Sequence, residues 1–225
     1  MTYIPEGMYT VRRFTAAAVG MARKTQKETE RTRSRILASA LSLFAKKGYE
    51  HVTFTDVAAR LDMTKGAVYW HFASKEALLL ALVDEMFGKF RRQIDELMPK
   101  DELTFPAMAE TMVKNAGRII RDAKGKAFFL LMHEQLQWAS ASMAKVREDL
   151  LTNERFGPWH AFRTAVANDR ACGRVRDDVE PERVAHVCIA IWDGLVHAHI
   201  AKFMSCDLQD TMRHAFDGVW RSIRK

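Results

Sequence analysis

The sequence predicts an all-α protein. Residues that favour helices dominate the 225-residue chain, and there are no runs of β-branched residues of the kind that form strands. Hydrophobic residues, 48% of the total, recur every three or four positions in many segments, which is the spacing of amphipathic helices. The chain is long enough for one large or two modest domains.

The first predicted helix covers residues 27–47. Its buried face is expected from Ile36, Leu37, Ala40, Leu41 and Phe44. Gly48 follows, where a glycine often closes a helix. Residues 1–26 are expected to be a disordered tail. Two alternatives are a start placed too early, with Met21 as the working start, and a basic arm that touches nucleic acid.

Residues 53–72, TFTDVAARLDMTKGAVYWHF, predict two short helices joined by a tight turn. Thr53 is placed to cap the first helix, with Asp56 three residues later, and Thr64 is placed to cap the second. The first helix has a clear apolar face, whereas the second has few apolar side chains to bury. The segment therefore predicts a helix-turn-helix whose second helix turns most of its side chains outward.

The basic charge of the chain is concentrated around this motif. The net charge is +7, and residues 21–80 carry 11 Lys and Arg against 6 Asp and Glu, whereas residues 81–225 carry 22 against 21. This imbalance favours a polyanionic partner for the first part of the chain. The alternatives are a basic surface that is merely solvated and a three-helix unit without a ligand.

A long helix over residues 75–97 is shared between the two parts. Further helices are predicted over residues 104–122, 125–140, 144–168 with a bend at Pro158, 181–204 and 208–223. No apolar run approaches the roughly 18 residues that span a bilayer, so we expect a soluble protein without a membrane partner. Cys172, Cys188 and Cys206 are widely spaced, which fits a reducing, cytoplasmic location.

Residues 30–83, ERTRSRILASALSLFAKKGYEHVTFTDVAARLDMTKGAVYWHFASKEALLLALV, resemble the DNA-binding domain of the TetR family of bacterial repressors. The segments MARKT and GAVYWHF are similar to the AcrR-like repressors of multidrug efflux pumps. The resemblance implies a helix-turn-helix DNA-binding domain over residues 27–74. A helical ligand-binding and dimerisation domain over residues 75–225 would follow.

The resemblance also assigns roles to residues of the motif. Thr53, with Thr55 close by, would contact phosphate, Lys65 and Gly66 would lie nearest base edges, and Tyr69, His71 and Lys75 would hold phosphates. The full set of expected DNA-binding residues is Arg33, Thr53, Thr55, Thr64, Lys65, Gly66, Tyr69, His71 and Lys75. Trp70 is expected to pack inward, and for Arg33 a surface ion pair with Glu30 is the alternative.

The second part of the chain is rich in methionine and aromatic residues, which suit a pocket for varied apolar ligands. The expected ligand-binding residues are Phe105, Met108, Met112, Phe129, Met132, His133, Trp138, Trp159, Phe162 and Trp192. His133, Gln135 and His160 are candidate polar anchors. The alternative is that these side chains fill a helical core.

Small residues at helical spacing predict a dimer interface in the second part. Ala190, Gly194, Ala198 and Ala201 would let two helices from each of two chains approach closely. His186, Asp193 and His197 share a helical face, but they span too far for one ion, so neither a metal nor a cofactor is expected. No catalytic motif is present, so an enzyme is not expected.

The prediction for function is a homodimeric, ligand-responsive repressor that binds a pseudo-palindromic double-stranded DNA operator. A small apolar or aromatic effector would release it, and an efflux pump is the target that the resemblance suggests. The alternative is an architectural or ligand-independent DNA-binding protein.

Overall fold

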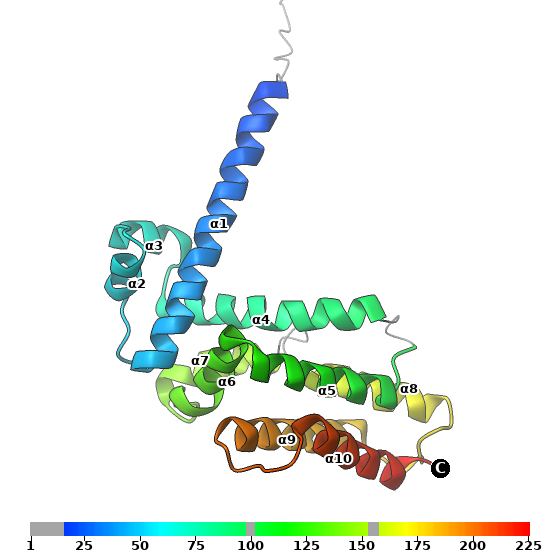
Figure 1. Ribbon diagram of the computed structural model, residues 1–225. Helices are drawn as coiled ribbons and strands as arrows, with labels where there is room; N and C mark the ends of the chain where they lie inside the picture. The colour runs from blue at the N-terminus through cyan, green and yellow to red at the C-terminus, as the bar shows by residue number, and fades with distance from the viewer. Residues whose placement is uncertain (1–15, 98–101, 153–157) are drawn as a thin grey trace, which may run out of the picture.

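The computed structural model describes residues 16–97, 102–152 and 158–225, and within these ranges the regular elements are helices and no strand is present. The all-α prediction is thereby confirmed. Figure 1 shows two tiers: α1 with the short α2 and α3 at one end, and a bundle of longer helices at the other. None of the described helices combines the length and apolar character needed to cross a membrane.

The N-terminal end consists of α1 (Ala16–Lys47), α2 (Phe54–Arg60) and α3 (Lys65–His71). The helix predicted over residues 27–47 begins earlier, at Ala16, so the part of the expected tail from residue 16 to residue 26 is helical. The remainder of that tail lies outside the described residues. Gly48 closes α1 with a left-handed backbone, φ 83°, as its position predicted.

Helix α4 (Lys75–Leu97) joins the two ends of the molecule. Leu78, Leu79, Leu82 and Val83 are buried in the same cluster as α1, α2 and α3. Further along the same helix, Phe90 belongs to the core of the C-terminal bundle. The N-terminal cluster also includes side chains from α6 to α7, so the two clusters do not divide simply at residue 75.

The C-terminal helices differ from the predicted segments at their ends. They are α5 (Phe105–Arg121), α6 (Ala123–Leu130), a π-helix (Leu131–Gln135), a 3-10 turn (Ala141–Met143), α7 (Ala144–Thr152), α8 (Pro158–Ala171), α9 (Pro181–Ile200) and α10 (Leu208–Ile223).

Local hydrogen bonds and a proline explain where these helices begin and end. The single helix predicted over residues 125–140 is interrupted, and the Trp138 indole donates to the Met132 carbonyl at 2.6 Å across the turn. Pro158 starts α8 instead of bending one long helix, because proline suits the first helical position. Helix α9 ends at Ile200 rather than at Met204. Just beyond its end, Lys202 takes a positive φ of 61°, and its amide donates a hydrogen bond to the His199 carbonyl.

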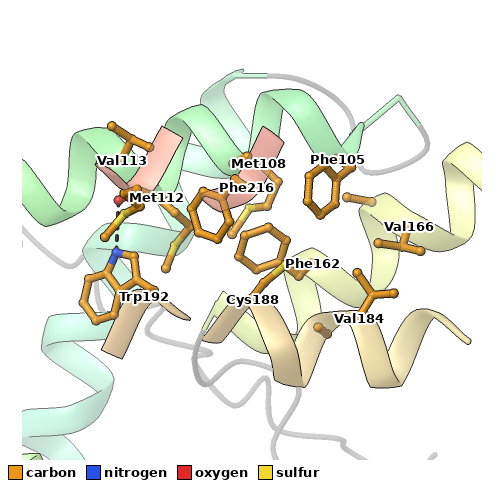
Figure 2. Close-up of a cluster of buried hydrophobic side chains, with 14 of the residues drawn as sticks. Phe105, Met108, Met112, Val113, Phe162, Val166, Val184, Cys188, Trp192 and Phe216 are labelled. Carbon is orange, nitrogen blue, oxygen red and sulfur yellow. Dashed lines mark hydrogen bonds between the residues drawn. The ribbon is translucent and has the colours of Figure 1, made fainter. Parts of the chain in front are cut away.

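The core of the C-terminal bundle is held by packing and by a few buried hydrogen bonds (Figure 2). The Trp192 indole of α9 donates to the Met112 carbonyl of α5 at 3.0 Å. Asp169 is fully buried and accepts from the Phe105 amide at 2.7 Å and from the Arg174 guanidinium at 2.7 Å. These bonds fix α9 and α8 against α5 and so set the walls of the space beside them.

Candidate DNA-binding surface and ligand cavity

Helix α2 is anchored by the predicted capping pair. The Asp56 amide donates to the Thr53 hydroxyl oxygen at 3.3 Å, while the Asp56 carboxylate accepts from the Thr53 amide at 2.9 Å and from its hydroxyl at 2.6 Å. These bonds, first that of the hydroxyl, lower the pKa of Asp56 to about 2. Because the Thr53 hydroxyl proton is engaged, the exposed Thr55 is the freer of the two to donate to a phosphate.

Helix α3 presents most of its surface to solvent. Thr64 caps it by accepting from the Ala67 amide at 3.2 Å, and Val68 is the residue it buries. Tyr69 is 50% exposed and Trp70 is 72% exposed, so the prediction that Trp70 packs inward is wrong. Two residues beyond Val68, a side chain lies roughly 200° further round the helix, on the outer face.

Gly66 stands in open space on this outer face. A Cβ built there meets only the Thr64 hydroxyl oxygen, at 3.8 Å, and its φ is not positive. Neither packing nor backbone geometry in the free protein therefore requires glycine at this position. Because Gly66 has no side chain, another molecule can approach the backbone of α3 closely at this position.

The rings and charges of α3 form a contiguous exposed patch. The Lys65 ammonium lies 5.6 Å from the centre of the Tyr69 ring, and that ring packs edge-on against Phe54 of α2 at 4.8 Å. His71 is half-buried, and its pKa is lowered by burial and then by the nearby Arg33 charge. Both effects favour the neutral form of the His71 ring in the free protein.

Two of the expected phosphate-binding residues are turned toward the protein. The Lys75 ammonium donates to the carbonyl oxygens of Tyr49 and Glu50 at 3.0 and 3.3 Å. The Arg33 guanidinium lies over the Phe72 ring, 5.2 Å from its centre, rather than beside Glu30. Both side chains stabilise the fold around the motif in this conformation.

A cavity of about 660 Å³ lies in the C-terminal bundle, between α4, α5, α6, the π-helix and α9. Its volume falls in the range of small-molecule sites. Of the residues predicted to bind a ligand, Met112, Phe129, Met132, His133, Trp138 and Trp192 line it. The sequence pattern therefore predicted six of the residues that line this cavity.

The other predicted ligand-binding residues lie away from this cavity. Phe105, Met108 and Phe162 are at most 1% exposed and fill the core between α5 and α8, where they contact protein on all sides (Figure 2). Trp159 packs beside His186, to whose ring nitrogen its indole donates at 3.3 Å. For Phe105, Met108 and Phe162 the alternative interpretation, a helical core, describes the structure, and Trp159 is half-buried against that core.

Several wall residues were not predicted to bind a ligand. Met86, Phe87 and Phe90 come from α4, and Asn115 comes from α5. The sequence carries one usable signal for Asn115: it lies between Met112 and Ile119 on the same helical face.

Several charged groups on the wall have partners in the protein. His133 stacks on Phe129, and its Nε2 lies 3.4 Å from the Asp193 carboxylate. Lys124 pairs with Glu85 at 2.7 Å, and the Asp122 carboxylate accepts from the backbone of α6. In the described part of the chain, no three His, Cys, Asp or Glu side chains are grouped as metal ligands.

The small residues of α9 face outward. Ala190, Gly194 and Ala201 are exposed, Ala198 is half-buried, and the neighbouring Val187 is 45% exposed. A Cβ added at Gly194, or at Gly218 of α10, meets nothing within 4 Å. The chain thus has an open, small-residue face on the helices predicted to form a dimer.

Known proteins are similar to this chain both in the helix-turn-helix segment and over most of its length. Residues 36–82 match the family described as "Bacterial regulatory proteins, tetR family". TtgR, an HTH-type transcriptional regulator of Pseudomonas putida, is 25% identical over 189 residues, covering 84% of this chain and 89% of TtgR. AcrR of Shigella flexneri is 34% identical over 87 residues, covering 37% and 40% of the two chains.

Solved structures share the fold over nearly the whole chain. The SmeT–triclosan complex superposes with a TM-score of 0.71 at 23% identity, covering 86% of this chain and 92% of SmeT. NalD, titled the secondary repressor of the MexAB-OprM multidrug efflux pump in Pseudomonas aeruginosa, gives 0.64 at 19% identity, covering 88% and 98%. Residues 36–82 are therefore a TetR-family DNA-binding domain, and the chain is similar over most of its length to TetR-family transcriptional regulators of the AcrR-like kind.

Proposed function

We propose that this chain is a ligand-responsive repressor that works as a homodimer on a pseudo-palindromic operator. Its relatives include regulators whose names and titles mention multidrug efflux pumps, and a structure of one of them, SmeT, is titled as a complex with triclosan. We extend that role to this chain and place it in the cytoplasm, with the operator DNA. An efflux-pump gene is the proposed target.

The observation that carries this proposal is the shared helix α4. It begins directly after the reading helix α3, and its first turns are buried among the helices of the DNA-binding end. Its later turns supply Met86, Phe87 and Phe90 to the cavity wall. A ligand that pushes this wall therefore moves a helix whose first turns share a core with the three helices of the DNA-binding end.

For DNA binding, we propose Thr55, Thr64, Lys65, Gly66, Tyr69, Trp70 and His71 as the contact surface, with Thr53, Lys75 and Arg33 supporting it from inside. Two such surfaces, one from each protomer, would enter major grooves one turn of DNA apart. A ligand releases the operator only if it binds the two domain arrangements unequally. The open face of α9 is the proposed contact between protomers.

A gel-shift assay with the DNA upstream of the protein's own gene tests this function. At fixed salt, we expect a saturable shift that survives competitor DNA and is lost with an aromatic compound that binds the cavity. Lys65→Ala should weaken the shift, while Lys114→Ala, which removes an equal charge from α5, should not. A specific shift that no compound alters would instead support a ligand-independent DNA-binding protein.

A further inference from the structure

Trp70 is the most exposed aromatic side chain among the described residues of the DNA-binding end. Its indole is 72% exposed, whereas the neighbouring Tyr69 is 50% exposed and packs edge-on against Phe54 of α2. The His71 ring meets the indole edge-on at 4.7 Å and supports it at the end of α3. Tryptophan is mostly buried in proteins, so an exposed one within a binding surface indicates a contact with the partner.

The position of Trp70 on α3 is the centre of the outer face. Val68 is fully buried and marks the inner face of this helix. A helix turns by about 100° per residue, so Gly66 and Trp70, two residues before and after Val68, both lie roughly 160° away from it. Gly66 stands in open space and adds no side chain, whereas Trp70 adds the largest one. A groove that closely approaches the backbone at Gly66 therefore receives the indole one helical turn further along.

The chemistry of the indole limits what it can recognise in a duplex. The faces of the bases are stacked on one another, so the major groove presents their edges. Among these edges the C5-methyl group of thymine is apolar, and the other groups are hydrogen-bond donors and acceptors. The indole carries one N–H donor and no acceptor, so the amino groups of adenine and cytosine find no partner on it.

We propose that Trp70 reads thymine, by packing its indole against the C5-methyl group of one thymine in each half of the operator. The proposal rests on the proposed function, in which α3 enters the major groove. Cytosine lacks the methyl group and presents an amino donor at the same edge, which contact with the indole would leave without an acceptor. Trp70 is thus a specificity-determining residue that selects thymine over cytosine at one position of each half-site.

Tyr69 provides a matched control on the same helix. Its ring packs against Phe54, and the Lys65 ammonium lies 5.6 Å from its centre. Its hydroxyl can donate to a phosphate, and such a contact carries no sequence information. Tyr69→Phe should therefore weaken binding to all sequences alike, whereas Trp70→Ala should change which sequences are preferred.

Selection of binding sites by the full-length protein tests this assignment. The native protein, Trp70→Ala and Tyr69→Phe each select from a pool of random duplexes at the same salt concentration. We expect the native protein and Tyr69→Phe to enrich the same thymine in each half-site. Trp70→Ala should lose the preference at that position and keep the others, with an unchanged melting temperature because the side chain is exposed. A thymine preference retained by Trp70→Ala, or a Trp70-dependent preference for a purine, would overturn the proposal.

Deoxyuridine in place of the selected thymine removes the methyl group alone. On the duplex selected by the native protein, this change in both half-sites should weaken binding by about fifteenfold, which is about fourfold for each methyl group. The affinity of Trp70→Ala, measured in the same way by fluorescence anisotropy, should change by less than about twofold. Equal losses in the two proteins would assign the methyl contact to another residue. The absence of any loss in the native protein overturns the proposal, whatever the variants show.

The same selection separates this inference from the function on which it rests. If the native protein enriches no sequence, specific operator binding fails, and the proposed function fails with it. If the native protein enriches a sequence whose thymines Trp70→Ala still prefers, specific operator binding stands and only the role of Trp70 fails.

Discussion

The ammonium nitrogen of Lys75 lies 3.0 Å from the carbonyl oxygen of Tyr49 and 4.3 Å from the centre of the Tyr49 ring. Tyr49 is 1% exposed, between α1 and α2, and burial raises the pKa of its phenol. Lys75 therefore connects the start of α4 to the loop before α2. This lysine, expected from the family resemblance to hold phosphate, stabilises the DNA-binding end from within.

Replacing Lys75 with Met should destabilise the protein, because the two loop carbonyls lose a charged donor. We expect a loss of about 2 kcal/mol in the free energy of unfolding, measured in urea. Lys65→Met, at an exposed position, should change that free energy by less than about 0.5 kcal/mol while weakening DNA binding. If Lys75→Met kept full stability and lost DNA affinity, Lys75 would be a phosphate contact after all.

Replacing Gly66 with Ala should separate stability from DNA binding. A Cβ fits at this position in the free protein, and alanine favours the helix over glycine by up to about 1 kcal/mol. The melting temperature should therefore rise or stay constant. Operator affinity should fall by about tenfold or more, because a methyl group at the groove displaces contacts worth about 1–3 kcal/mol each. Unchanged affinity in the gel-shift assay would show that Gly66 does not face the DNA.

The capping pair of α2 predicts a defined loss of stability in acid. The pKa of Asp56 is lowered to about 2 in the folded protein, below its ordinary value of 3.8. The contribution of this carboxylate to the free energy of unfolding is therefore complete at pH values above its ordinary pKa, and it is lost as the pH falls toward 2. Urea midpoints of the native protein and of Asp56→Asn should differ by a constant amount from pH 7 to about pH 5 and converge below that. A difference that stays constant down to pH 2 would contradict the capping role of the carboxylate.

Replacing Gly194 with Arg should produce a folded monomer. The side chain enters open space in the single chain, so helix content by circular dichroism should be unchanged. In a dimer that uses this face of α9, the same side chain would separate the protomers. Light scattering should then report the mass of one chain, and the gel shift should weaken. A dimeric mass for Gly194→Arg would move the interface elsewhere.

The sequence alone determined where α2 and α3 begin and where α1 ends. Thr53, Asp56 and Thr64 act through bonds to backbone groups three residues away, and such local contacts can be recognised in a linear pattern. The apolar spacing of α1 likewise identified side chains that are buried. These features depend on neighbours within one or two helical turns.

Only the tertiary structure decided which apolar side chains line a cavity and which fill the core. Met108 and Met112 occupy the same face of α5, one turn apart, yet only Met112 reaches the cavity wall. The difference arises because α8 packs against α5 around Met108, whereas the cavity between α4, α5 and α9 opens beside Met112. The direction of Lys75 and the exposure of Trp70 were likewise set by segments distant in the sequence, which no local pattern encodes.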